Sequence, residues 1–165
     1  MKKLELYKLE TPNDLDIRDR RKIAEAVNPL LADTFALFVK TKNFHWHMTG
    51  SHYRDYHLLL DEHSEQIFAM VDVLAERVRK LGEQTIHSIG QIKQLQTLRD
   101  VNESLSADDM LQNLLDDNKA FLKNLRKVHE VCSKRNDFAT TSVLETYIDE
   151  TERRVWFLFE TLQNK

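Results

Sequence analysis

Histidines gather in one short segment, NFHWHMTGSHYRDYHLLLDE at residues 43–62. Five of the seven histidines fall between positions 45 and 63. Imidazole nitrogens bind transition metals and also transfer protons near neutral pH. The segment therefore raises metal binding and acid–base chemistry as alternatives, beside a chance gathering on a polar helix face.

Carboxylates extend this pattern along the helix expected from Tyr53 to Leu81. With Leu60 at zero and about 100° per residue, five potential ligands fall between roughly 60° and 160°: His57, Asp61, Glu65, Asp72 and Glu76. A solvated face is the alternative reading, but such faces usually mix charge signs. No lysine or arginine occurs between Asp61 and Glu76, so the face predicts a metal site.

The spacing of these ligands is too long for one chain. Asp61 and Asp72 are eleven residues apart, about 16 Å along a helix, whereas ligand bonds to such metals are about 2 Å. Two copies of the helix that cross antiparallel about a two-fold axis near positions 66 and 67 would remove the difficulty. Asp61 and His57 of one chain would then face Asp72 and Glu76 of the other, which predicts two identical sites per dimer.

The expected ligands of each site are two imidazoles and three carboxylates: His45, His57, Asp61, Asp72 and Glu76. Mixed nitrogen and oxygen donors suit Fe²⁺, with Mn²⁺, Zn²⁺ or Co²⁺ as substitutes. The carboxylates carry enough negative charge for one or two ions and would stabilise Fe³⁺.

Composition indicates that helices position these ligands. The 165 residues include only three glycines and two prolines, 41% are hydrophobic and 31% are charged. That balance is typical of one folded domain rich in long helices. The net charge of −3 does not indicate a polyanion-binding protein. Cys132 is the single cysteine, which excludes an internal disulfide and fits a reducing cytoplasm.

Helix signals divide the chain into a tail at residues 1–13 and a domain at residues 14–165. The first helix is expected to begin near Asp14 or Asp16, with Pro29 kinking or restarting it. Later helices are expected from Tyr53 to Leu81, at about Ile92 to Leu98, from Ser106, and from Asn136 or Asp137. Four long helices with one long connection predict an all-α, ferritin-like four-helix bundle, with a short extra helix between helices two and three.

At the ligand positions the sequence resembles the Dps family, the DNA-binding proteins from starved cells or mini-ferritins. The family pattern is H-W-x-M/V-x-G, then a histidine and an aspartate four residues apart, then D-x-x-x-E-R. Here it reads His45 to Gly50, His57 with Asp61, and Asp72 with Glu76 and Arg77. The order of helices matches over nearly the whole chain.

The resemblance implies a hollow homododecamer with twelve ferroxidase sites at two-fold interfaces. His45, His57 and Asp61 would come from one subunit, and Asp72 and Glu76 from its partner. The family oxidises Fe²⁺, commonly with hydrogen peroxide, stores ferric oxide in the shell and so protects DNA from oxidative damage. The alternative is a DNA-compacting nucleoid protein with little ferroxidase activity. A di-iron oxygenase is disfavoured, because no Glu-x-x-His motif occurs.

Other residues near the predicted site have less definite roles. Trp46 is expected to pack beside the site, as in the family, or to be a core tryptophan. Glu65 is a candidate for iron entry or mineral nucleation, with a structural role as the alternative. His47 and His52 are expected to be solvent-exposed bystanders, while His63 lies about 200° from Asp61, so a further metal position involving these histidines stays open.

Interaction with DNA is expected to be weak and salt-dependent. The tail carries Lys2, Lys3 and Lys8 but also Glu5 and Glu10, although many copies on one particle would add by multivalency. Glu145 and Asp149 are candidates for a pore lining. No apolar stretch approaches the roughly 20 residues that a membrane helix needs, and no signal peptide is recognised. A cytoplasmic location is expected, with nucleoid association as an addition.

Overall fold

The computed structural model describes residues 11–101 and 104–163, and its regular secondary structure is all α-helix. Five helices are present among these residues: α1 (Ile17–His47), α2 (Tyr53–Lys80), α3 (Ile89–Leu95), α4 (Ala107–Ser133) and α5 (Phe138–Leu162). This part of the chain contains no strand. Residues 1–10 of the expected tail lie outside the described residues, so the boundary between tail and domain stays a prediction.

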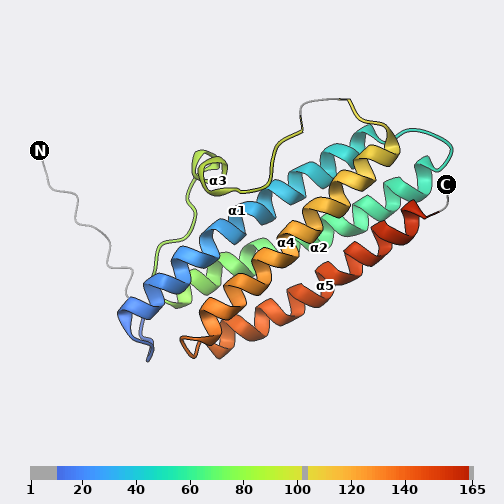
Figure 1. Cartoon of the computed structure of the whole chain (residues 1–165). Coiled ribbons are helices and arrows are strands. Elements are labelled where there is room, and N and C mark those ends of the chain that lie inside the picture. Colours follow the sequence, from blue (N-terminus) through green and yellow to red (C-terminus); the bar gives the residue numbers. More distant parts are fainter. Residues whose placement is uncertain (1–10, 102–103, 164–165) are drawn as a thin grey trace, which may run out of the picture.

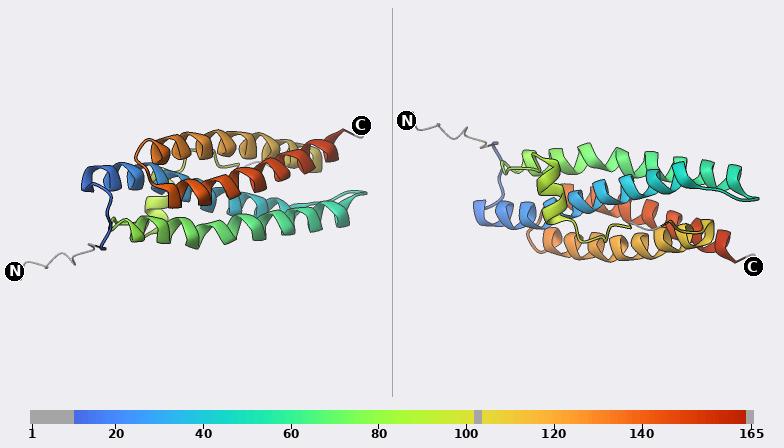
Figure 2. Two further views of the ribbon diagram at one scale, coloured as in Figure 1. Left: turned by 90° about the horizontal axis from the view of Figure 1, so that it is seen from below. Right: turned by 90° about the horizontal axis from the view of Figure 1, so that it is seen from above.

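The four long helices form a bundle of two layers. Figure 1 shows α1 beside α2 and α4 beside α5, and Figure 2 shows the two pairs stacked on each other. The long connection after α2 runs along the outside of the bundle, carries α3 against α1, and brings α4 back to the end where α1 meets α2. The predicted all-α four-helix bundle with an extra helix is therefore confirmed. No helix in the described ranges is long and apolar enough to cross a membrane.

Capping side chains explain where the helices begin. Asp16 accepts a hydrogen bond from the backbone N–H of Arg18 at 2.8 Å, which confirms one of the two predicted starts of α1. Ser106 and Asp137 cap α4 and α5 in the same way, and each such cap stabilises a helix by about 1 kcal/mol. Ser88 caps α3. The short helix therefore begins at Ile89, three residues before the predicted start.

Pro29 does not restart α1, which is one continuous helix of 31 residues. A proline inside a helix costs about 3 kcal/mol, because it removes a backbone donor and crowds the preceding turn. Ile23 and Val27 before it and Leu37 after it are completely buried in the core. Burial of that apolar stripe on both sides of the proline offsets the local cost.

A buried carboxylate holds the long connection against the bundle. Asp33 of α1 is 1% exposed and accepts hydrogen bonds from the backbone N–H groups of Thr97 and Leu98 at 2.5 and 3.2 Å. It also accepts hydrogen bonds from the Thr97 hydroxyl at 2.7 Å and from the Asn124 amide at 3.2 Å. Because a buried charge is costly without such partners, this set fixes the path of the connection after α3.

His63 is buried. The sequence pattern left its role open and did not predict this burial. Its side chain faces the bundle interior and is 2% exposed. The same interior holds Arg154, which is completely buried and donates hydrogen bonds to Asn118 at 3.0 Å and to Thr151 at 2.7 Å. Burial, followed by the positive charges of Arg154 and Arg153, lowers the pKa of His63 to about 3. The imidazole is therefore neutral in the folded protein at any mildly acidic pH.

This burial predicts an acid-sensitive fold. The unfolded chain protonates His63 near pH 6.5, whereas the folded chain protonates it only near pH 3. The free energy of unfolding should therefore fall as pH drops from 6.5 towards 3, by about 2 kcal/mol at pH 5 from this group alone. We expect His63→Gln to lose that part of the pH dependence, measured as the change in Tm between pH 7 and pH 5. His87→Gln, which alters an exposed histidine, is the matched control. An unchanged pH dependence in His63→Gln would contradict the prediction.

Candidate metal centre

The α1–α2 hairpin brings His45 and His57 together. His45 lies in the last turn of α1 and His57 in the second turn of α2, so the short turn between the helices sets one beside the other. Their rings stack with centroids 3.7 Å apart and planes 21° from parallel. The two imidazoles predicted as ligands from one chain therefore do meet.

Reciprocal hydrogen bonds fix both rings. Nδ1 of His45 lies 2.8 Å from the backbone oxygen of His57, and Nδ1 of His57 lies 2.9 Å from the backbone oxygen of His45. A carbonyl oxygen only accepts, so each Nδ1 must carry the proton and donate it. In the neutral rings each Nε2 then keeps its lone pair. This arrangement selects the tautomer that binds a metal through Nε2 and holds the ring in position.

Asp61 supplies a carboxylate beside these nitrogens and is held by a lysine. Its Oδ1 lies 3.8 Å from Nε2 of His45 and accepts a hydrogen bond from Nζ of Lys42 at 2.5 Å. That hydrogen bond is the main cause of the lowered pKa of Asp61, and the positive charge of Lys42 adds to it. The carboxylate is therefore ionised and ready to bind a cation, but one of its oxygens is already engaged.

Asp72 and Glu76 lie further along α2 and do not reach this group. Both are exposed, and Glu76 forms an ion pair with Lys80 at 3.0 Å. Within the described ranges no three histidine, cysteine or acidic side chains come close enough to hold a metal ion. The candidate ligands of one chain thus lie in two separate groups, and their combination across two chains stays a prediction.

Apolar side chains lie beside Asp72. Asp72 lies at the edge of a hollow of about 500 Å³, lined mainly by apolar side chains of α1, α2 and the connection around α3. Phe68 is 54% exposed and packs on Phe38 with ring centroids 4.9 Å apart. Ile89, which is 78% exposed, lines the same hollow. An exposed apolar surface of this kind is typical of a protein interface.

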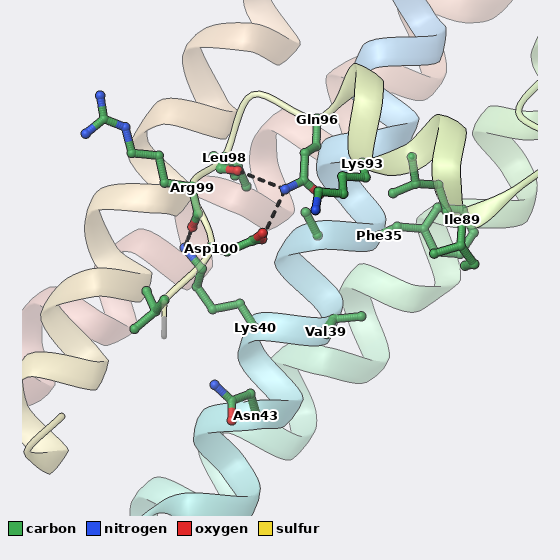
Figure 3. A pocket seen from close by; sticks show the side chains of 13 residues that line it. Phe35, Val39, Lys40, Asn43, Ile89, Lys93, Gln96, Leu98, Arg99 and Asp100 are labelled. Atoms are coloured by element: carbon green, nitrogen blue, oxygen red, sulfur yellow. Dashed lines mark hydrogen bonds between the residues drawn. The ribbon is translucent and has the colours of Figure 1, made fainter. Parts of the chain in front are cut away.

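A second pocket, between α1 and the connection, has different chemistry. It has a volume of about 380 Å³, and Figure 3 shows apolar side chains such as Phe35, Val39 and Ile89 along it. Two of its charged members are already engaged: Lys40 donates to Asp117 at 2.5 Å, and Asp100 accepts from Gln96 at 3.0 Å. The other two, Lys93 and Arg99, are cations and do not bind metal ions. The pocket therefore lacks the converging free ligands that the histidine pair provides.

Comparison with known proteins identifies the family of this chain. The family model of the ferritin-like domain matches residues 24–165. An uncharacterised low temperature-induced protein of Nostoc is 36% identical over 141 residues, 84% of this chain and 79% of that protein. The DNA protection during starvation protein of Helicobacter pylori is 27% identical over 138 residues, 83% of this chain and 96% of that protein. The chain belongs to the Dps family of ferritin-like proteins.

Solved Dps structures share the whole fold. The Dps protein of Vibrio cholerae O1, described as a ferritin-like diiron-carboxylate protein, superposes with a TM-score of 0.86 at 27% identity, covering 90% of this chain and 94% of that one. DpsC of Streptomyces coelicolor superposes with a TM-score of 0.91 at 25% identity, covering 99% and 98%. The predicted ferritin-like architecture and membership of the Dps family are thereby confirmed.

Apart from buried His63, the other residues considered near the site are exposed in the single subunit. His47 and His52 are exposed, as expected. Trp46 is 66% exposed, so the alternative of a core tryptophan is wrong for the single subunit, and its packing beside the site stays a prediction. Glu65 is exposed on α2. Its role in iron entry or nucleation stays a prediction, as does a pore lined by Glu145 and Asp149.

Two neighbours of the half-site were not assigned from the sequence. Lys42 lies three residues before His45, and Tyr53 lies four residues before His57. Each spacing is about one helical turn and puts the residue on the face of its neighbour. The one-turn spacing places Lys42 and Tyr53 near the histidines. It does not reveal the ion pair of Lys42 with Asp61 or the stacking of Tyr53 on His57.

The ion pair at Asp61 predicts competition between Lys42 and a metal ion. Removing the ammonium in Lys42→Met frees Asp61 Oδ1 and removes a positive charge near the site, worth about 1 kcal/mol or more. We expect Co²⁺ to bind roughly five- to tenfold more tightly, measured by titration calorimetry at pH 7. Lys119→Met removes a more exposed lysine, which also pairs with an aspartate, Asp116, and should leave Co²⁺ binding unchanged. Equal or weaker binding in Lys42→Met would count against the competition.

Proposed function

We propose that this Dps-family protein is a ferroxidase that oxidises Fe²⁺ with hydrogen peroxide and stores the ferric oxide within a homododecamer. The observation that carries the proposal is the locked pair of histidines, whose Nε2 atoms are left free beside an ionised Asp61. Iron is the substrate and the cargo. Oxidation of iron by peroxide consumes both Fe²⁺ and hydrogen peroxide, which would otherwise react to form hydroxyl radicals. This consumption would protect DNA.

The donor set suits this chemistry. Two imidazoles and the carboxylates of Asp61, Asp72 and Glu76 provide the mixed nitrogen and oxygen ligands that Fe²⁺ accepts, and Mn²⁺, Zn²⁺ or Co²⁺ would substitute. The carboxylates stabilise the additional charge of Fe³⁺. Each site would take one or two iron ions, with the first bound by His45, His57 and Asp61.

A partner subunit would complete each site. The predicted two-fold axis passes near residues 66 and 67, next to exposed Phe68. Burial of this apolar α2 surface against its copy would supply the association energy. It would bring the partner's Asp72 and Glu76 to the histidine pair. The dodecameric shell, the cytoplasmic location and association with the nucleoid rest on membership of the Dps family.

Mixed assemblies test the shared site directly. We expect His57→Ala with Asp61→Ala, and separately Asp72→Ala with Glu76→Ala, to lower the rate of peroxide-driven Fe²⁺ oxidation at least tenfold, because each removes one half of every site. Co-assembly of the two defective chains should recover activity, since a mixed dimer contains one intact site and one site that keeps only His45. Stopped-flow absorbance of Fe³⁺ formation measures this.

The matched control replaces two other exposed carboxylates, Glu25→Ala with Glu130→Ala, and should keep the rate of the unaltered protein. A site built within one chain predicts no recovery on mixing, because every chain then carries a defective site. Unchanged oxidation in Asp72→Ala with Glu76→Ala would remove these residues from the site.

Compaction of DNA with little ferroxidase activity is the second candidate function. It is favoured by the name of the relative from Helicobacter pylori, a DNA protection during starvation protein. The chain itself has a net charge of −3, which opposes strong binding to a polyanion.

We therefore expect only weak DNA binding, arising from the lysines of the first ten residues repeated on one particle. A mobility shift should appear at low salt and disappear by several hundred millimolar salt, because each phosphate contact releases counterions. A shift that persists unchanged at high salt, without metal at the two-fold site, would instead favour the DNA-compacting function.

A further inference from the structure

Tyr53 extends the histidine pair into a column of three rings. Its ring stacks on His57 with centroids 5.1 Å apart and planes 30° from parallel, and His57 stacks in turn on His45 at 3.7 Å. Tyr53 is 46% exposed. One end of the column therefore carries an oxidisable phenol open to solvent, and the other carries the free nitrogen beside Asp61.

Reduction of hydrogen peroxide requires an electron that such a phenol can donate. Complete reduction of hydrogen peroxide to water takes two electrons, whereas one Fe²⁺ supplies one. A single-electron reaction would release a hydroxyl radical. Lys42 already occupies Oδ1 of Asp61, which favours a site that begins with one ion. The second electron must then come from a group close to that ion.

We propose that Tyr53 supplies this second electron through the ring of His57. The inference rests on the proposed ferroxidase function and adds a donor to it. One Fe²⁺, the phenol of Tyr53, one hydrogen peroxide and one proton from solvent give Fe³⁺, a neutral tyrosyl radical and two waters. The O–O bond breaks, iron and tyrosine each lose one electron, and the phenolic proton joins the departing oxygen.

Position distinguishes Tyr53 from the other aromatic residues. Among the ring contacts of the described residues, only this one joins an oxidisable ring to a predicted metal ligand. Tyr56, one turn along α2, contacts His52 instead, in a tilted arrangement with ring centroids 5.6 Å apart. Tyr147 is 8% exposed, and burial raises its pKa to about 12, which impedes release of its proton. Tyr53 has both the contact and the access to water.

Freeze-quench electron paramagnetic resonance tests the proposal on the assembled protein. The protein is loaded anaerobically with one Fe²⁺ per site and mixed with one equivalent of hydrogen peroxide. We expect a tyrosyl signal in the unaltered protein and in Tyr56→Phe, and at least a tenfold loss of that signal in Tyr53→Phe. Hydroxyl-radical adducts of a spin trap should rise severalfold in Tyr53→Phe alone. The replacement keeps the ring and removes only the hydroxyl group.

Zn²⁺ binding separates electron donation from packing. Its Kd should stay within about twofold in Tyr53→Phe, because the ring stack is retained. A larger loss of Zn²⁺ affinity would make Tyr53 a packing residue and overturn its assignment as donor. A radical that persists in Tyr53→Phe, or none in a protein that still oxidises Fe²⁺, would overturn the inference and leave the ferroxidase function standing. Failure of the unaltered protein to oxidise Fe²⁺ would overturn both.

Discussion

The rigidity of α2 is the constraint on which the function of this fold depends. A helix rises about 1.5 Å per residue, so Asp61 and Asp72 are held far further apart than the two bond lengths that would join them through one ion. Neither side-chain rotation nor local bending closes such a gap. A chain with this ligand spacing can complete a metal site only by combining with a second copy. Exposed Phe68 and the apolar hollow beside Asp72 offer a surface on which such a copy would pack.

Within one subunit, the backbone prepares the half-site. The carbonyl oxygens that bind Nδ1 of His45 and His57 belong to the two histidines themselves, so the same turn of the hairpin sets the ring positions and the tautomer. No reorganisation of these rings is then needed when a metal arrives. Lys42 keeps Asp61 ionised, which favours binding of a cation, but it also occupies one of the carboxylate oxygens. The same contact therefore both prepares Asp61 for a metal ion and competes with that ion.

The residues in the interior of the bundle disfavour a metal site inside it. Four-helix proteins with an internal di-iron centre place paired carboxylates in the core. At the corresponding depth of the described bundle lies a buried cation, Arg154, with the neutral partners Asn118 and Thr151 and the neutral His63 nearby. A positive charge in a medium of low dielectric repels a second cation strongly. A metal ion is therefore disfavoured in this part of the bundle interior.

Sequence alone determined the helices, because their signals are local. Apolar periodicity along α2, the caps Asp16 and Ser106, and Gly82, whose φ is +79° just after α2, depend only on neighbouring residues. The spacing of the candidate ligands on one rigid helix likewise predicts that one chain does not complete the site. Tertiary structure decided what depends on contacts between distant segments. Core packing kept α1 continuous through Pro29, and burial made His63 an interior residue. The meeting of α1 and α2 created the reciprocal histidine bonds, the Lys42–Asp61 pair and the Tyr53 stack, since these contacts exist only after the hairpin closes.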